Sequence, residues 1–92
     1  SADVTRKVKV SFARGTSSDA SISAVVKVGS NTGLVFDTTT PSSDMTQTTD
    51  STITLSKDSC VEVTVTVFVD GRGTNINSNY ITGSVELTLT LA

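Results

Sequence analysis

A run of valines at every second position, from residue 61 to residue 69, is the feature that most constrains the fold. In an extended chain alternate side chains point to the same face, so this spacing predicts a β-strand with one valine face. β-Branched residues favour the pleated, half-buried surface of a sheet. We therefore expect this strand, which begins near Cys60 and ends at Asp70-Gly71, at the centre of the sheet system. Its valine face comprises Val61, Val63, Val65, Val67 and Val69.

Other segments show the same alternation or a short apolar run: residues 4–12, 22–28, 34–36, 53–55 and 85–91. Gly, Ser, Asn and Asp separate them at intervals of roughly 10 residues, which is typical of an antiparallel sandwich or jelly roll. Residues 37–51 contain few apolar side chains and predict a surface loop with at most a short edge strand. No segment keeps a helical apolar period. We expect an all-β sandwich or jelly roll of about seven strands, with no helix longer than a turn.

The length and composition indicate one small domain, residues 1–92. A chain of this size builds only a small hydrophobic core unless disulfides or an oligomeric partner add to it. Ser and Thr make up roughly a third of the residues, well above ordinary usage. Because Thr favours strands and Ser favours turns, this excess agrees with an all-β protein.

The charge and the hydropathy pattern of the chain argue against some classes of partner. The net charge is −2 and the isoelectric point is near 4.7, so we expect no nucleic-acid partner, which would need a basic surface. No apolar run approaches the roughly 20 residues of a membrane-spanning helix. Because the chain starts at Ser1 rather than Met, we expect that a secretion signal has been removed and that the protein is extracellular or at the cell surface.

The residue types argue against catalysis. The chain has no His, so it lacks the usual general base, the usual zinc-binding nitrogen and any Ser-His-Asp arrangement. Carboxylates are scattered singly, and no glycine-rich phosphate-binding motif occurs. We therefore predict a protein that is not an enzyme, with no catalytic residue and no cofactor.

Cys60 is the single cysteine, which excludes a disulfide within the chain. We expect it to be a small buried side chain on the face opposite the valines. Two alternatives stay open: a nucleophile near Lys57, and a disulfide between subunits.

The segment after the valine strand carries spaced oxygen-bearing side chains, a pattern that is also found in calcium-binding loops. An EF-type loop needs oxygen ligands at alternate positions and a closing Glu, whereas here Arg72 stands at a ligand position and no Glu follows. We predict no metal site. We interpret the segment as a turn at Asp70-Gly71 followed by a loop with Asn75, Asn77 and Asn79. A weak oxygen-ligand calcium site near Asp70 stays open as an alternative.

Three successive features occupy the C-terminal part of the chain: a Val/Thr strand ending in Asp-Gly at 63–71, an Asn-bearing loop at 75–81 and an alternating strand at 82–89. Together they resemble the C-terminal end of the camelysin and TasA-like secreted proteins. The resemblance implies an exported jelly-roll protein that builds extracellular matrix or biofilm fibres, related to archaeal threads and bundling pili that use donor-strand exchange. The chain departs from the family in its shorter length and in Arg72-Gly73, which stands where acidic residues are common. The metallopeptidase activity ascribed to camelysin is not carried over, since no zinc ligands are present.

The N-terminal segment differs in charge from the rest of the chain. Up to Arg14, four basic residues and one acidic residue give +3, and the net charge of −2 leaves −5 for the remainder. We expect residues 1–14 to include a strand that is donated to the neighbouring subunit, where opposite charge would assist backbone pairing. An ordinary first strand with solvated charges is the alternative. The expected donor-strand interface is Val4, Arg6, Val8, Val10 and Phe12, and the expected acceptor wall is Val61, Val63, Val65, Val67, Val69, Val85, Leu87, Leu89 and Leu91.

Two functions from different classes follow. The first is a structural subunit of an extracellular filament, of biofilm-matrix or pilus type, whose only required partners are copies of itself. The alternative is a monomeric extracellular binding module that presents its loops to a carbohydrate or a protein. A viral capsid or decoration protein is a third candidate, because jelly rolls are common there. O-linked glycans on the abundant Ser and Thr stay open.

Overall fold

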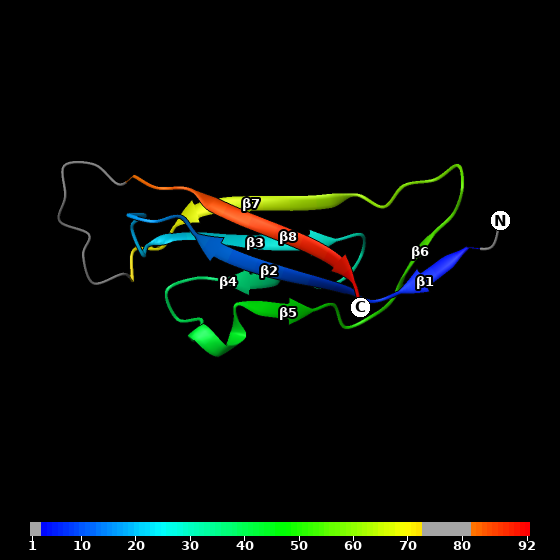
Figure 1. The fold of residues 1–92 in the computed structure, drawn as a ribbon, viewed down its shortest axis with the longest axis horizontal. Helices are drawn as coiled ribbons and strands as arrows, with labels where there is room; N and C mark the ends of the chain where they lie inside the picture. Colours follow the sequence, from blue (N-terminus) through cyan, green and yellow to red (C-terminus); the bar gives the residue numbers. More distant parts are fainter. Residues whose placement is uncertain (1–2, 73–81) are drawn as a thin grey trace.

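The computed structural model describes residues 3–72 and 82–92, and nearly all of their regular secondary structure is β-strand (Figure 1). The described residues form eight strands and one 3-10 turn. The elements are β1 Val4–Arg6, β2 Val8–Arg14, β3 Ile22–Val28, β4 Leu34–Phe36, η1 Ser42–Asp44, β5 Thr46–Thr48, β6 Ile53–Leu55, β7 Val63–Val69 and β8 Val85–Leu91. The all-β prediction is confirmed, and η1 is the longest helical element in these residues.

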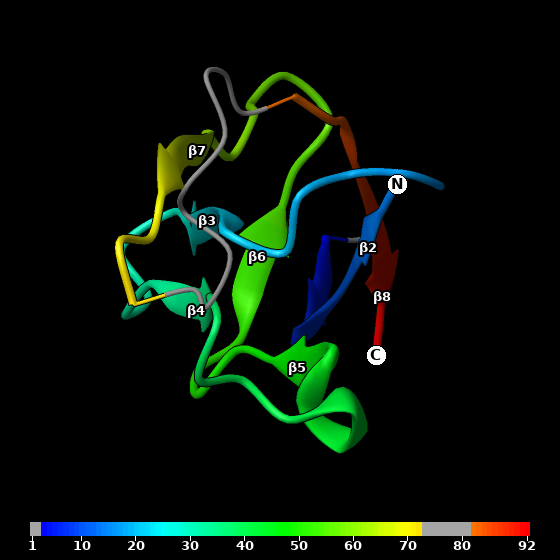
Figure 2. The same cartoon turned by 90° about the vertical axis from the view of Figure 1, so that its left-hand side faces the viewer.

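The strands form three antiparallel sheets. Two have three strands each, in the orders β5-β2-β8 and β4-β3-β7, and β1 pairs with β6 in a separate two-stranded ribbon. The two larger sheets face each other (Figure 2), so the architecture is sandwich-like. The jelly-roll form stays a prediction.

The core lies between the two central strands, β2 and β3. Alternate residues of each strand point inward because strand side chains alternate between faces. Phe12 of β2 stacks on Phe36 of β4 with ring centroids 5.2 Å apart and an interplanar angle of 7°. This contact joins the two sheets directly. The buried apolar residues are Val8, Val10, Phe12, Ala24, Val26, Val28 and Phe36.

The prediction that the valine strand lies at the centre of the sheets is wrong. β7 is an edge strand that pairs with β3 alone among the described strands, and it begins at Val63 rather than near Cys60. Periodicity sets which face of a strand is apolar, but it carries no information about how many neighbours pair along the hydrogen-bonding direction. The central positions belong to β2 and β3 instead.

The N-terminal strand expected at residues 4–12 is divided in two. β1 and β2 are separated by Lys7, and β1 extends beyond the sandwich to pair with β6, as Figure 1 shows at the end of the long axis. β2 lies between β5 and β8, so it is not an edge strand. The molecule measures 53 × 24 × 21 Å along its principal axes, and this ribbon contributes to its elongated shape.

One long side of the sandwich is closed by the chain itself. Residues 37–51 run from β4 through η1 to β5, which agrees with the prediction of a surface loop with at most a short edge strand in this segment. The Gln47 side chain donates a hydrogen bond to the carbonyl of Val35 at 2.9 Å, and the amide of Phe12 donates to the carbonyl of Met45 at 2.9 Å. The bond from Gln47 ties the two sheets together on this side, and the bond from Phe12 holds the start of β5 against β2. The opposite side, between β7 and β8, is built differently.

Candidate functional site

The candidate site is an apolar groove between the edge strands β7 and β8. Register shows which side chains face it: Val65 is the direct partner of Val26, and Leu89 is the direct partner of Val10. Direct partners share a face of their sheet, so β7 and β8 direct their apolar residues to the same interior side as the buried core. We call this feature the β7–β8 groove. Its residues are Val63, Val65, Val67, Val69, Val85, Leu87, Leu89 and Leu91.

Most of the groove residues are exposed although they face the interior side. Val67 and Val69 retain 56% and 54% of their accessible surface, and Leu91 retains 44%. In the described residues no other strand pairs with the outer edges of β7 and β8, so each edge carries a row of free backbone donors and acceptors. A small domain rarely leaves a continuous apolar face open without an interaction to cover it. A further strand would therefore cover the apolar side chains of the groove and pair with the free backbone groups of its edges.

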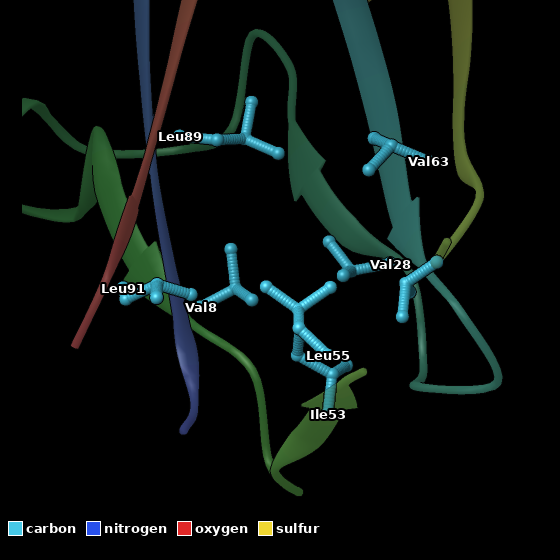
Figure 3. Close-up of a pocket in the computed structure, with 8 residues that line it drawn as sticks. Val8, Val28, Ile53, Leu55, Val63, Leu89 and Leu91 are labelled. Carbon is cyan, nitrogen blue, oxygen red and sulfur yellow. The ribbon is translucent and has the colours of Figure 1, made fainter. Parts of the chain in front are cut away.

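The groove deepens at the end that is nearest to β6. A pocket of about 190 Å³ lies there, between the C-terminal half of β8 and the start of β7 (Figure 3). Ile53 and Leu55 of β6 form part of its lining, so the two-stranded ribbon contributes to the end of the groove. Every side chain of the lining is aliphatic, which suits a hydrophobic plug and offers nothing for acid-base chemistry. The lining is Val8, Val28, Ile53, Leu55, Val61, Val63, Leu89 and Leu91.

The structure brings the predicted acceptor residues together. Eight of the nine flank the β7–β8 groove, and Val61 lines its end pocket. Sequence reasoning missed Ile53, Leu55, Val8 and Val28 as parts of the same pocket. Only the alternation of residues 53–55 indicated an apolar face there, and no sequence signal placed it beside β7 and β8.

The predicted donor residues do not lie together. Val8, Val10 and Phe12 are at most 4% exposed and belong to the core of their own chain, which differs from the predicted place on a neighbour. They are held there because β2 is paired on both sides, with β5 and with β8. Val4 and Arg6 lie apart from them on the exposed strand β1. Donation of a strand between chains stays a prediction.

A charged cluster fixes the far end of β7. Asp70, which follows the strand, accepts hydrogen bonds from Nε and Nη2 of Arg72, both at 2.9 Å, and from the Thr38 hydroxyl at 2.6 Å. The same Nη2 of Arg72 donates to Asp37 at 2.9 Å. The cluster ties the end of β7 to the loop after β4.

The hydrogen bonds of this cluster set the ionisation of its members. Hydrogen bonds from the Arg72 side chain, followed by those from Thr38, hold the pKa of Asp70 far below its usual range. The Thr39 hydroxyl is the main cause of the lowered pKa of Asp37, and Asp70 raises the pKa of Arg72. Both carboxylates are therefore ionised at neutral pH, and the single Arg72 guanidinium forms an ion pair with each of them.

This cluster also bears on the open question of a weak oxygen site near Asp70. Both carboxylate oxygens of Asp70 are engaged by Arg72 or Thr38. Within residues 3–72 and 82–92 no three His, Cys, Asp or Glu side chains gather as metal ligands. Asn75, Asn77 and Asn79 lie outside the described residues. Sequence reasoning treated Arg72 only as an interruption of a calcium pattern and missed its role as the link between two aspartates.

The prediction of a buried Cys60 is wrong. Its side chain is exposed in the segment that precedes β7. The strand begins three residues later, at Val63, so the alternation that would place Cys60 on an inner face does not reach it.

The fold and the groove define a class: an all-β, sandwich-like protein with one apolar side that is open among residues 3–72 and 82–92. Comparison with known proteins gives no match to a family model, to a curated protein or to a solved structure. The resemblance to camelysin and TasA-like proteins therefore stays a prediction. In the described residues no helix is long and apolar enough to cross a membrane.

Proposed function

We propose that this protein is a structural subunit of an extracellular filament, without enzymatic activity, whose copies join head to tail by donor-strand exchange. The observation that carries the proposal is the β7–β8 groove, with its exposed valines and leucines and two edges with which no further described strand pairs. An extended segment from another copy would add a strand to an edge and place its side chains in the groove.

The energetics favour such an occupant. Burial of apolar surface contributes about 25 cal/mol per Å², and full burial of one Val or Leu side chain contributes about 1.5–3 kcal/mol. Six groove residues are at least 38% exposed, so partial burial of this set contributes several kcal/mol by the same principle. Seven apolar residues are buried among the described residues, so several kcal/mol is a large fraction of the free energy of unfolding of such a domain. Exchange between copies would thus supply what the small core lacks.

Shape and charge are consistent with a head-to-tail arrangement. The β1–β6 ribbon lies at one end of the long axis, and β7 and β8 run along that axis (Figure 1). A ribbon that reaches the groove of the next copy uses two different surfaces of the protein, and such a heterologous contact forms open filaments. The segment up to Arg14 carries +3 against −5 on the remainder, which favours contact between copies.

The resemblance to camelysin and TasA-like proteins supports the cellular setting of the proposal. It suggests secretion, a place in the extracellular matrix or at the cell surface, and the jelly-roll form of the sandwich. The Ser- and Thr-rich surface would then face the outside medium, where O-linked glycans are an additional feature of the proposal.

The test is electron microscopy and analytical ultracentrifugation of the full chain, with a matched pair of variants on β7. Val67→Glu places a charge in the groove, and Thr66→Glu places the same charge on the opposite face of the same strand. Both positions are exposed, so both variants should fold. We expect filaments from the wild type and Thr66→Glu, and none from Val67→Glu. A wild-type protein that stays monomeric at millimolar concentration would overturn the filament and favour the binding module.

A further inference from the structure

We infer that the donated strand ends at Lys7. The segment up to this residue leaves β6 and enters the β7–β8 groove of a second copy, while β2 stays in its own core. This inference rests on the proposed function, and it narrows the exchanged unit from residues 1–14 to the part before Val8.

β2 is built into the core of its own chain. Val10 is completely buried, Val8 and Phe12 are 4% exposed, and Phe12 stacks on Phe36. β2 is also hydrogen-bonded on both sides, along its full length to β8 and at Lys9–Ser11 to β5. Departure of this strand would remove three of the seven buried apolar residues and leave both neighbouring strands without their partner. An exchange that includes β2 would therefore dismantle the subunit.

β1, in contrast, contributes nothing to the buried core. All described residues before Val8 are exposed, and β6 is the only described strand with which β1 pairs. Its side-chain contacts are at the surface: the hydroxyls of Thr5 and Thr54 are 3.1 Å apart, and Nε of Arg6 donates to the carbonyl of Ala92 at 2.5 Å. Lys7 separates β1 from β2, and its carbonyl accepts a hydrogen bond from the amide of Ala92 at 2.8 Å. A change of backbone direction just before Lys7 therefore leaves the pairing of β2 intact.

The dimensions of the segment and the groove agree. β7 and β8 are each seven residues long, and at least seven residues precede Val8. At about 3.3 Å per residue, each of these lengths corresponds to about 23 Å of extended chain. The segment can therefore cover the groove along its whole length without drawing on β2.

The charges also agree. Before Val8 the segment carries Arg6 and Lys7 against Asp3, a net charge of +1, whereas residues 61–69 and 85–91 carry Glu62 and Glu86, a net charge of −2. The segment and the two strands are therefore opposite in net charge, which favours their association. Val4 supplies an apolar side chain of the size that the aliphatic lining accepts. The occupant that fits the groove is this segment of a second copy of the chain.

Two disulfide staples on either side of Lys7 test the inference. Thr5 and Thr54 are direct partners on β1 and β6, and Ser11 and Thr88 are direct partners on β2 and β8. We would make Thr5→Cys with Thr54→Cys, and separately Ser11→Cys with Thr88→Cys, both in a Cys60→Ser background because Cys60 is exposed. Each variant is oxidised as a dilute monomer, and closure of the staple is confirmed by mass spectrometry. Filament formation is then compared by electron microscopy and pelleting before and after reduction.

We expect the oxidised Thr5–Thr54 staple to abolish filaments and reduction to restore them, with at least a tenfold change in pelleted protein. We expect the oxidised Ser11–Thr88 staple to leave filaments unchanged. Loss of filaments with the oxidised Ser11–Thr88 staple, restored by reduction, would show that β2 is exchanged and would overturn the inference while the filament remains. Filaments from the oxidised Thr5–Thr54 variant would overturn it as well. If the Cys60→Ser parent forms no filaments, the proposed function itself fails.

Discussion

Val26 and Val65 are direct cross-strand partners on β3 and β7, yet Val26 is completely buried and Val65 is 42% exposed. Both side chains lie on the same face of one sheet. The difference arises because the opposing sheet covers β3 through β2, whereas β7 and β8 are left with the groove between them. The transition from core to open surface thus occurs across one strand spacing.

Val26→Ala and Val65→Ala form a matched pair that measures this transition in the monomer. Removal of the buried Val26 side chain loses about 0.8 kcal/mol for each methylene-sized group and leaves a cavity, so we expect a loss of about 2–3 kcal/mol in the free energy of unfolding. We expect Val65→Ala to change it by no more than about 0.5 kcal/mol. Urea denaturation of dilute protein is the measurement. Equal losses at both positions would contradict an open groove in the single chain.

Gly29 and Gly71 give a second matched pair. Gly29 has φ of +56° and a Cβ there would meet Cγ1 of Val61 at 3.2 Å, whereas a Cβ on Gly71 would meet none of the described residues within 4 Å apart from its chain neighbours. We expect Gly29→Ala to destabilise the protein by about 1 kcal/mol or more, because the left-handed backbone disfavours a side chain. Gly71→Ala should be close to neutral. Thermal unfolding of both variants, followed by circular dichroism, decides whether this ordering holds.

The lowered pKa of Asp70 predicts a specific dependence of stability on pH. A carboxyl group whose pKa is lower in the folded state stabilises the fold above its unfolded pKa of about 4, and this contribution is lost as the pH falls further toward the folded value. We expect the urea midpoint of the wild type to fall between about pH 4 and pH 2. Asp70→Asn should be less stable at neutral pH and should show a shallower fall.

Arg72→Gln serves as a second variant for the same prediction. It removes the largest cause of the low pKa of Asp70 and leaves the Thr38 hydrogen bonds in place. We expect it to show a slope between those of the wild type and Asp70→Asn. An unchanged slope in Asp70→Asn would exclude this carboxylate as a source of the acid sensitivity.

The exposure of Cys60 predicts free reactivity in the folded protein. Its side chain lies in an exposed segment before β7, so a thiol reagent reaches it without unfolding. We expect native and urea-unfolded monomer to react with a maleimide at rates within about tenfold of each other. Quantitative mass spectrometry of timed samples measures both rates. Strong protection in the native monomer would show that the Cys60 thiol is buried, as the sequence pattern suggested.

The sequence by itself determined the strand character and the apolar face of nearly every element. Alternation at residues 22–28, 53–55 and 85–91 predicted β3, β6 and β8 correctly, because side-chain period is a local property of an extended backbone. It allowed for at most a short edge strand in residues 37–51 and did not locate β5, because Thr46–Thr48 carries no apolar signal and pairing with β2 makes the strand.

Only the tertiary structure decided which apolar faces are covered. Val8 and Val65 both belong to alternating runs, but among the described strands β2 lies in the middle of its sheet and β7 at an edge. That choice depends on pairing between segments distant in the chain, such as β2 with β8, which no local pattern encodes. The same nonlocal pairing leaves the valine run beside an open groove, although its regularity suggested the centre of the fold.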